Sequence, residues 1–558
     1  MLTTELGRRR YLAAAGTVIL VLGFLYLAAL RGEVLDFDDS AHLAEPLLSL
    51  PFLQALGQMF SSAHQHVWWP LLWLSWWLQG GAAHPLALHL VDLGLFLGSA
   101  AILTVVLNRA GLGRWTALLA VVLWAVHPLR VESVAWLTGR KDVLSLFFVS
   151  LAALGAMPPS PSRPGAVRLA LAHTAFGLAL LAKTAVAPVA AVLWVLSWRR
   201  DGAREATRRF AGFAALAVAD AAVCIFGFEA TGPNGELVTG SRWLLGLWSH
   251  GVWLVHEVWP AGLAALYPVG THQALFVGVG IAGLVGLAVL AARVPSALPI
   301  AALWVLPLVP VAGPLRLSFW AADRYTLIAS LAPAVGVALL IESLARRRRN
   351  AWLVAVPVVA ALALATHARI PAWHDDVALW QSDLERGDDP LRRSQLAAAY
   401  GSRGRFADAL VELRRAEALA PASSRIRAHR MFAQLAAQGW TEKTRRLSAF
   451  LEPPPSNAEG WERAMAALLE AREWSLGVEA ARTAVAVGAK GPTCALGEVF
   501  GLHQLGDDAG ARRALESAAR VHPEIDRARI EGALREGTFL APRRPPQAAD
   551  GAAPSSAR

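Results

Sequence analysis

Apolar runs long enough to cross a bilayer restrict the fold of this chain more than any other feature. Residues 11–30 read YLAAAGTVILVLGFLYLAAL, and an α-helix needs about 20 apolar residues to span the hydrocarbon core. Similar runs recur as far as residue 367, whereas the rest of the chain is polar, charged and rich in alanine. With 55% hydrophobic residues, the composition is typical of a membrane protein.

The number of these apolar runs predicts an all-α, polytopic transmembrane helix bundle of about eleven spans. We expect the spans at residues 11–30, 86–107, 115–127, 142–157, 169–182, 185–198, 210–228, 274–292, 297–312, 326–344 and 351–367. Several of them are shorter than a full bilayer crossing, which is typical of broken or re-entrant helices.

Clusters of arginine predict the orientation of these spans. Arg8, Arg9 and Arg10 precede the first run, and cytoplasmic loops of bacterial-type inner-membrane proteins carry an excess of Lys and Arg. The many later spans favour a retained signal anchor over a cleaved signal peptide. Alternation from a cytoplasmic N-terminus brings nearly every other Arg cluster inside, so the net charge of +10 reflects topology and no nucleic-acid partner is expected. It places outside the segments 31–84, 128–141, 183–184, 229–273, 313–325 and everything after residue 367.

The polar C-terminal part predicts a separate helical domain. We divide the chain into a transmembrane domain at 1–367, a tetratricopeptide-repeat domain at 368–540 and a disordered tail at 541–558. Residues 395–421 carry the small and apolar positions of such a repeat, and poorer copies surround Ala480 and Ala511 and cover 428–455. The alternative is a generic Ala-rich helical array. Either array is expected to bind a peptide or protein.

An acidic cluster follows the first span. Asp36, Asp38 and Asp39 crowd the segment RGEVLDFDDSAH, and close like charges raise one another's pKa unless a cation compensates them. Such a cluster suits a catalytic base or a metal-assisted acceptor site. The alternative is a solvated acidic loop. Downstream, the tryptophans of 68–77 favour a helix in the lipid headgroup zone.

Ionisable groups beside hydrocarbon are costly, which makes them candidates for function. The segment 127–142 carries six of them, and two further cations stand at the ends of later spans. We take as candidates His127, Arg130, Glu132, Arg140, Lys141 and Asp142, then Lys183, and Arg324 with Tyr325. Arg and Lys bind phosphate well. The alternatives are an ordinary charged turn, a local Asp323–Arg324 pair, and cations that snorkel to the interface.

Seven stretches along the chain resemble one family. They are LDFDDSAHL, WWPLLWLSWWL, AHPLALHLVDL, HPLRVESVAWLTGRKDVLS, LAKTAVAP, ADRYTLIAS and WHDDVALWQSDL. Their order and content resemble the transmembrane and tetratricopeptide-repeat-containing O-mannosyltransferase-like family, which belongs to the GT-C class of glycosyltransferases. The resemblance covers nearly the whole chain. Trp69 and Asp92 depart from it, because His and Asn are more usual at those positions.

The resemblance implies an enzyme that moves a sugar, with mannose as the expected one, from a polyprenyl-phosphate donor to a hydroxyl, on protein, at the extracytoplasmic face. In this family an acidic residue of the first external loop is the base, which maps onto Asp38. Asp39 then is its partner or the ligand of a divalent metal ion, and Glu132 orients a cation or the sugar. The donor phosphate is expected on Arg140, Lys183 and Arg324. The substrate is expected to be lined by Asp36, His127, Arg130, Lys141, Asp142 and Tyr325.

Two other functions compete with this interpretation. A non-enzymatic scaffold would use the membrane domain only to anchor a repeat array that binds proteins. A transporter or lipid flippase would place polar groups near the middle of the membrane and show internal pseudosymmetry. The polar groups lie at the ends of the runs instead, and the spans show no convincing internal repeat, so a glycosyltransferase that contacts membrane lipids is favoured.

Overall fold

The computed structural model describes most of the chain. The described residues are 2–65, 67–81, 84–159, 165–224, 241–268, 272–312, 320–421, 474–486, 491–522 and 525–536, with isolated positions between 426 and 469. The predicted tail at 541–558 and the predicted repeat copy at 428–455 lie outside them. The chain divides into two compact units, residues 1–387 and 388–558. The described part contains no β-strand, which confirms the all-α prediction.

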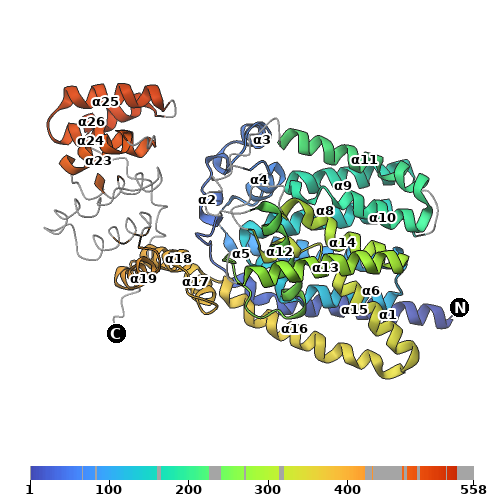
Figure 1. The fold of residues 1–558 in the computed structure, drawn as a ribbon. Helices are drawn as coiled ribbons and strands as arrows, with labels where there is room; N and C mark the ends of the chain where they lie inside the picture. The colour runs from blue at the N-terminus through green and yellow to red at the C-terminus, as the bar shows by residue number, and fades with distance from the viewer. Residues whose placement is uncertain are drawn as a thin grey trace, which may run out of the picture. The chain divides into compact units, whose positions relative to one another are not determined.

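The first unit is a bundle of helices (Figure 1). Its longer helices are α1 (Leu2–Leu25), α5 (Pro85–Arg109), α6 (Arg114–Ala125), α8 (Arg140–Ala156), α9 (Ala166–Ala182), α10 (Val189–Asp201), α11 (Ala203–Ala222), α12 (Arg242–Val258), α13 (Gln273–Arg293), α14 (Leu298–Leu308), α15 (Leu331–Arg347) and α16 (Ala355–Arg369). Shorter elements are η1 (Leu27–Arg31), α2 (Asp39–Leu43), α3 (Phe52–Ser61), α4 (Pro70–Trp77), η4 (Pro128–Arg130), α7 (Val131–Ala135), η5 (Leu137–Gly139), η10 (Asp323–Thr326) and α17 (Asp376–Leu384).

Within the described part, four helical segments are long and apolar enough to cross a membrane, not the eleven predicted. They are Gly7–Arg31, Pro85–Arg109, Gln273–Arg293 and Asn350–Trp373, and the bent pair α6 plus η4–α7 adds a fifth if it counts as one span. Helices do stand at the other predicted positions, but they are shorter or more polar. α14 has 11 residues with Pro307 inside it, and α8 begins with Arg140, Lys141 and Asp142. The sequence prediction therefore located the helices at its predicted spans but overestimated how many qualify alone as spans. It missed α12, which lies in segment 229–273, predicted to connect two spans.

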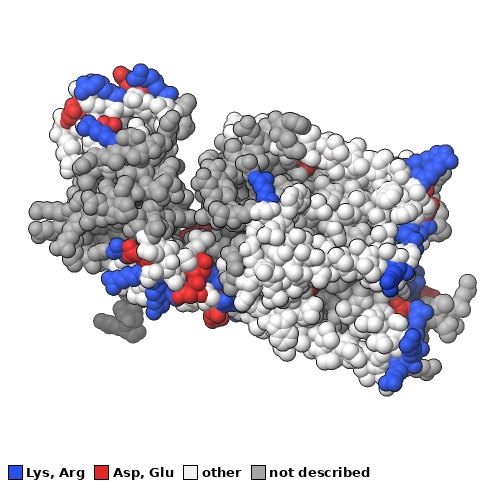
Figure 2. Space-filling view, viewed as in Figure 1, with Lys and Arg blue, Asp and Glu red and all other residues white. Residues whose placement is uncertain are grey.

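Basic side chains gather at one end of the first unit (Figure 2). The N-terminus and the α10–α11 and α15–α16 connections lie at this end, whereas α2, α3 and α4 lie at the opposite one (Figure 1). The surface between the two ends is nearly free of charge on the face shown (Figure 2). An uncharged surface between two charged ends is typical of a protein that crosses a membrane.

Helix α6 is broken immediately before the polar segment. Pro128 lacks the N–H that would continue a helix, and the two arms diverge by 65°. The imidazole of His127 accepts a hydrogen bond from the N–H of Leu129 at 3.4 Å and so caps the new turn. The chain then passes through η4, α7 and η5 before it enters α8. A continuous helix would distribute these polar side chains around its circumference. The succession of short helical turns allows several of them to converge instead.

An aromatic cluster attaches the loop that follows η1 to this segment. The indole N–H of Trp136 donates to the carbonyl of Phe37 at 2.9 Å, and the two rings lie 5.2 Å apart. Phe37 also packs edge-on against Trp380 at 5.5 Å and lies 6.2 Å from Trp373. These contacts hold α17 on the first unit, which is why the unit extends to residue 387, beyond the predicted boundary at 367.

The tryptophans of 68–77 occupy a different place from the predicted one. Trp73 and Trp76 are fully buried in a cluster with Leu72 and Leu137, so they form core and not a headgroup-facing stripe. Pro70 starts α4, a position that suits proline, and the helix packs against α3 and α9.

The second unit consists of helix pairs. Its described helices are α18 (Pro390–Ser402), α19 (Phe406–Leu419), α23 (Trp474–Ala486), α24 (Pro492–Gln504), α25 (Asp508–Val521) and α26 (Arg527–Glu536). In the α18–α19 pair, Ala397, Ala409 and Ala416 are buried, and Gly404 in the connecting turn adopts a left-handed φ of 72°. The carboxylate of Asp389 caps α18 by accepting from the N–H groups of Leu391 and Arg392. The buried alanines and Gly404 lie within residues 395–421, which the sequence predicts to be a tetratricopeptide repeat. The assignment to that repeat stays a prediction.

Candidate active site

Asp39 is buried between the loop that follows η1 and the segment before α8. Its side chain is fully buried, and one carboxylate oxygen accepts from the N–H of Thr138 at 2.7 Å and from its hydroxyl at 2.5 Å. The other oxygen accepts from the N–H of Leu35 at 3.2 Å. Residues 99 positions apart in the sequence are thereby fixed to one another, and Asp39 has little capacity left for a substrate.

The same burial makes Asp39 a source of pH-dependent stability. Burial raises its pKa from 3.8 to about 7, against the three donors, which lower it. Between about pH 4 and 7 the folded chain therefore keeps a proton on Asp39 that the unfolded chain has released. The contribution of this proton to the free energy of unfolding is complete below about pH 4 and is lost as the pH rises through 7. We expect Asp39→Asn to flatten this part of the pH profile of thermal unfolding, measured on the full chain in detergent. Parallel profiles for variant and wild type would contradict this assignment.

Asp38 has the opposite environment. Its side chain is exposed, and its carboxylate makes no hydrogen bond or ion pair within the described residues. Its backbone has a φ of 80°, which an L-residue other than glycine adopts rarely, with Asp and Asn the usual exceptions. Strain of this kind costs about 1–3 kcal/mol and clusters at functional sites. Its carbonyl accepts from the N–H of His42 at 3.0 Å and also contacts the His42 ring at 2.8 Å, which fixes the turn.

The ring of Trp136 contacts two cations. The Lys141 ammonium lies 4.3 Å from the ring centroid, and the guanidinium carbon of Arg324 lies 5.1 Å from it. Both distances are within the range of a cation–π interaction. Lys141 donates to the carbonyl of Thr138 at 2.8 Å, and its charge interacts with those of Asp38, Asp142, Lys183 and Arg324. The two cations and the loop that carries Asp38 therefore meet at Trp136, whose indole N–H donates to the carbonyl of Phe37.

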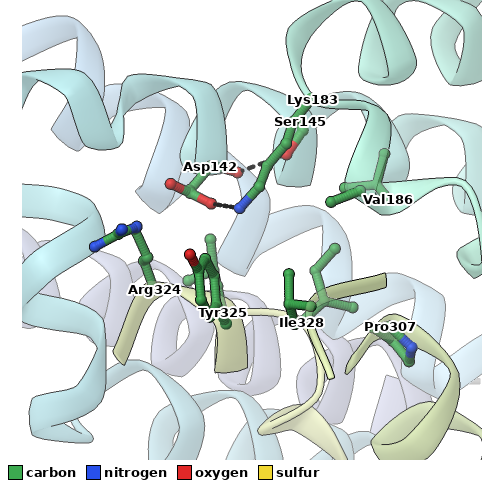
Figure 3. Close-up of a pocket in the computed structure, with 11 residues that line it drawn as sticks. Asp142, Ser145, Lys183, Val186, Pro307, Arg324, Tyr325 and Ile328 are labelled. Carbon is green, nitrogen blue, oxygen red and sulfur yellow. Dashed lines mark hydrogen bonds and ion pairs between the residues drawn. The ribbon is translucent and has the colours of Figure 1, made fainter. Parts of the chain in front are cut away.

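A small cavity lies beside these cations (Figure 3). It has a volume of about 30 Å³ and is lined by Asp142, Lys183, Arg324 and Tyr325, among others. The Lys183 ammonium is hydrogen-bonded to the Asp142 carboxylate and lies 5.6 Å from the centre of the Tyr325 ring. The second carboxylate oxygen of Asp142 is buried and has no hydrogen-bond partner among the described residues. The cavity admits a water-sized group in this state.

Glu132 positions Arg324. Its carboxylate forms a buried ion pair with the Arg324 guanidinium and also accepts from the Arg324 backbone N–H at 2.7 Å. The neighbouring Asp323 accepts from the Tyr267 hydroxyl at 2.5 Å, and burial raises the pKa of Asp323 to about 7. The structure thus resolves the alternatives for Arg324: it pairs with Glu132 and not with Asp323.

Arg140 lies apart from this cavity. Its guanidinium is fully buried and donates to Asp92 at 2.6 Å, to the carbonyl of Leu88 at 2.5 Å and to Gln79. These contacts occupy it within the bundle, so the structure does not bring it to the cavity with Lys183 and Arg324. Asp92, whose position departs from the resembling family, is explained as the counter-charge of Arg140.

This pair leads to a stability prediction. Asp92→Ala leaves the Arg140 guanidinium buried and uncompensated, and breaking such a pair costs about 3–5 kcal/mol. Asp92→Asn keeps an acceptor oxygen and is expected to cost clearly less. The midpoint of thermal unfolding in detergent measures both. A wild-type midpoint for Asp92→Ala would show that the pair does not contribute to stability.

Three further predicted residues, Arg130, His127 and Asp36, lie outside the cavity. Arg130 is buried and donates to Thr326 at 2.9 Å and Ser330 at 2.8 Å, while His127 contacts the carbonyl of Glu257 at 3.3 Å. These two therefore hold the η4 turn against neighbouring helices. Asp36 is exposed, and its N–H donates to Asp376 of α17 at 2.9 Å. None of the three lines the cavity.

Sequence reasoning missed two residues that organise this site, Trp136 and Thr138. Both stand in the WLTGRKD stretch, but neither is ionisable, so a search for charged groups passed over them.

The predicted metal ligand, Asp39, meets a specific difficulty. Both oxygens of Asp39 face N–H and O–H donors, and the described residues contain no group of three His, Cys, Asp or Glu arranged to hold an ion. Hydrogen-bond donors surround the Asp39 carboxylate, so its surroundings do not fit a bound metal ion.

Comparison of the chain with protein-family models, with curated proteins and with solved structures finds no match. The site therefore has to be interpreted from its own chemistry.

Proposed function

We propose that this protein is a membrane glycosyltransferase that moves a sugar from a polyprenyl-phosphate donor to a hydroxyl group. One observation carries the proposal: the exposed, strained Asp38 directly follows Phe37, whose carbonyl accepts from the Trp136 indole. The Trp136 ring contacts the guanidinium of Arg324, which lines the cavity together with Lys183. A carboxylate and several cations at one membrane surface suit a reaction in which a hydroxyl loses a proton and a phosphate gains charge.

The proposed reaction is a single displacement. The acceptor oxygen attacks the anomeric carbon of the sugar while its proton passes to the Asp38 carboxylate. The bond between that carbon and the phosphate oxygen breaks, and its electron pair stays on the polyprenyl phosphate. Lys183 and Arg324 stabilise the negative charge that develops there. Attack opposite the leaving group inverts the anomeric configuration.

Donor binding requires a rearrangement in this account. The cavity of about 30 Å³ is too small for a phosphate, and Lys183 is engaged by Asp142. A phosphate would compete with Asp142 for the ammonium group, while Arg324 stays oriented by Glu132. Tyr325 contacts both cations. Its ring centre lies 5.6 Å from the Lys183 ammonium and 5.0 Å from the guanidinium carbon of Arg324.

The finer membrane arrangement belongs to the same proposal. The shorter apolar helices cross or re-enter the bilayer together with the four candidate spans, the basic end faces the cytoplasm, and Asp38 faces the opposite side. The second unit is a tetratricopeptide-repeat array on that side and binds the protein that accepts the sugar. Its packed helix pairs with buried alanines support this assignment.

The direct test uses the purified full chain in lipid nanodiscs and a Ser/Thr-rich peptide acceptor. The donors are radiolabelled mannose, glucose and N-acetylglucosamine, each carried either on polyprenyl phosphate or on a nucleotide. Transfer from the lipid donor alone supports the proposal. Transfer from the nucleotide donor, or none from lipid donors carrying mannose, glucose or N-acetylglucosamine, refutes it. In the latter case, restoration of the cellular function by the second unit alone would identify the chain as a scaffold.

A further inference from the structure

A long apolar groove lies on the first unit, away from the site described above. It has a volume of about 650 Å³ and is formed by α1, α6 and α16, with Val21, Val122 and Val359 among its lining residues. None of its lining residues also lines the cavity at Lys183 and Arg324. Its volume lies within the range of pockets that bury a ligand, roughly 300–1,000 Å³.

The two walls of this groove are candidate membrane spans that the protein itself hardly covers. Only 17% of the apolar window of Gly7–Arg31 and 11% of that of Asn350–Trp373 is buried. The spans are joined where they end, because the His374 ring contacts the carbonyl of Ala28 at 2.9 Å. In a membrane such a groove faces hydrocarbon, so the chain of a lipid is the expected occupant.

The groove ends in two polar side chains. Arg31 and His367 lie at the ends of the spans, where lipid headgroups begin, and both are exposed. Neither forms an ion pair within the described residues, and no acidic side chain is among the described residues that line the groove. A cation without a counter-charge beside an apolar groove complements an anionic headgroup.

The dimensions fit one leaflet. The groove follows α1 and η1 from Thr17 to Arg31, a distance of roughly 20 Å at the rise of an α-helix. One leaflet contributes about half of a hydrocarbon core of about 30 Å. An acyl chain can therefore lie along the whole apolar part while the phosphate reaches Arg31.

We infer that this groove is a binding site for an anionic diacyl phospholipid, with one acyl chain between α1 and α16 and the phosphate on Arg31 and His367. The occupant is a structural lipid and not the sugar donor. The groove has neither a carboxylate base nor the paired cations of the cavity, so a donor bound there would have no group to activate an acceptor. The bound lipid fills the groove between these two spans.

The experiment is native mass spectrometry of the full chain in detergent, titrated with phosphatidylglycerol or with phosphatidylcholine of the same acyl chains. We expect tighter binding of phosphatidylglycerol, weakened about fivefold by Arg31→Gln and further by Arg31→Gln/His367→Gln. Ala363→Phe fills the groove and is expected to reduce binding of both lipids. The matched controls are Arg293→Gln and Val285→Phe, which change an exposed cation and an exposed apolar residue of α13 outside the groove.

Three results would overturn the inference. They are equal affinity for the two phospholipids, undiminished binding by the double variant, and displacement of phosphatidylglycerol by equimolar polyprenyl phosphate. No sugar transfer is measured, so this outcome is independent of the proposed enzymatic function.

Discussion

Asp38→Asn is expected to lower the rate of sugar transfer by about 10²–10⁴-fold, the usual contribution of a positioned general base. Asparagine tolerates the left-handed backbone of this position and has nearly the same shape, so the fold and the donor KM should be retained. The measurement is the initial rate of transfer from the polyprenyl-phosphate sugar by purified full chain in nanodiscs.

The matched control for this variant is Asp36→Asn. Asp36 is an exposed carboxylate of the same loop, and the structure gives its side chain no contact with the cations. We expect this variant to transfer sugar at a rate close to that of the wild type. If Asp38→Asn retains more than a tenth of the wild-type rate, Asp38 is not the base.

The second large effect concerns Lys183. The double variant Lys183→Gln/Asp142→Asn removes both members of a buried ion pair, which leaves no uncompensated charge and is often neutral for stability. Loss of one group that stabilises developing charge typically costs about 10²–10³-fold in kcat. We therefore expect the double variant to fold with a wild-type unfolding midpoint and to lose transfer by about this factor, with a raised donor KM.

Its control removes a comparable pair elsewhere. Arg209 and Asp201 form an ion pair at 2.7 Å near the start of α11, and each has a second charged neighbour, Glu205 and Arg200 respectively. Arg209→Gln/Asp201→Asn therefore removes one charge of each sign from this cluster. This variant should keep wild-type transfer. Normal kinetics of Lys183→Gln/Asp142→Asn would show that Lys183 serves only to neutralise Asp142.

Some parts of the fold follow directly from the sequence. The candidate spans at α1, α5, α13 and α16 consist of unbroken apolar runs, so hydropathy locates them. The position of the break in α6 follows from Pro128. The number of qualifying spans was overestimated because a short apolar run such as that of α14 predicts a helix without fixing how it lies in a membrane.

The pairing of charges could not be read in the same way. Arg140 and Lys183 look alike in sequence as lone cations beside apolar runs. Only the folded chain shows that Arg140 is held by Asp92 from α5, whereas Lys183 lines the cavity. Asp38 and Asp39 are also neighbours with indistinguishable side chains. The strained turn at Asp38 sends one carboxylate outward and buries the other against Thr138, so burial and hydrogen bonding separate their roles.

The most direct test of this account is a cryo-electron microscopy structure of the inactive Asp38→Asn chain with a bound polyprenyl-phosphate sugar. The account predicts the donor phosphate within hydrogen-bond distance of Lys183 and Arg324, with the anomeric carbon facing residue 38. A phosphate bound elsewhere, or one separated from residue 38 by the thickness of the bilayer, would contradict it.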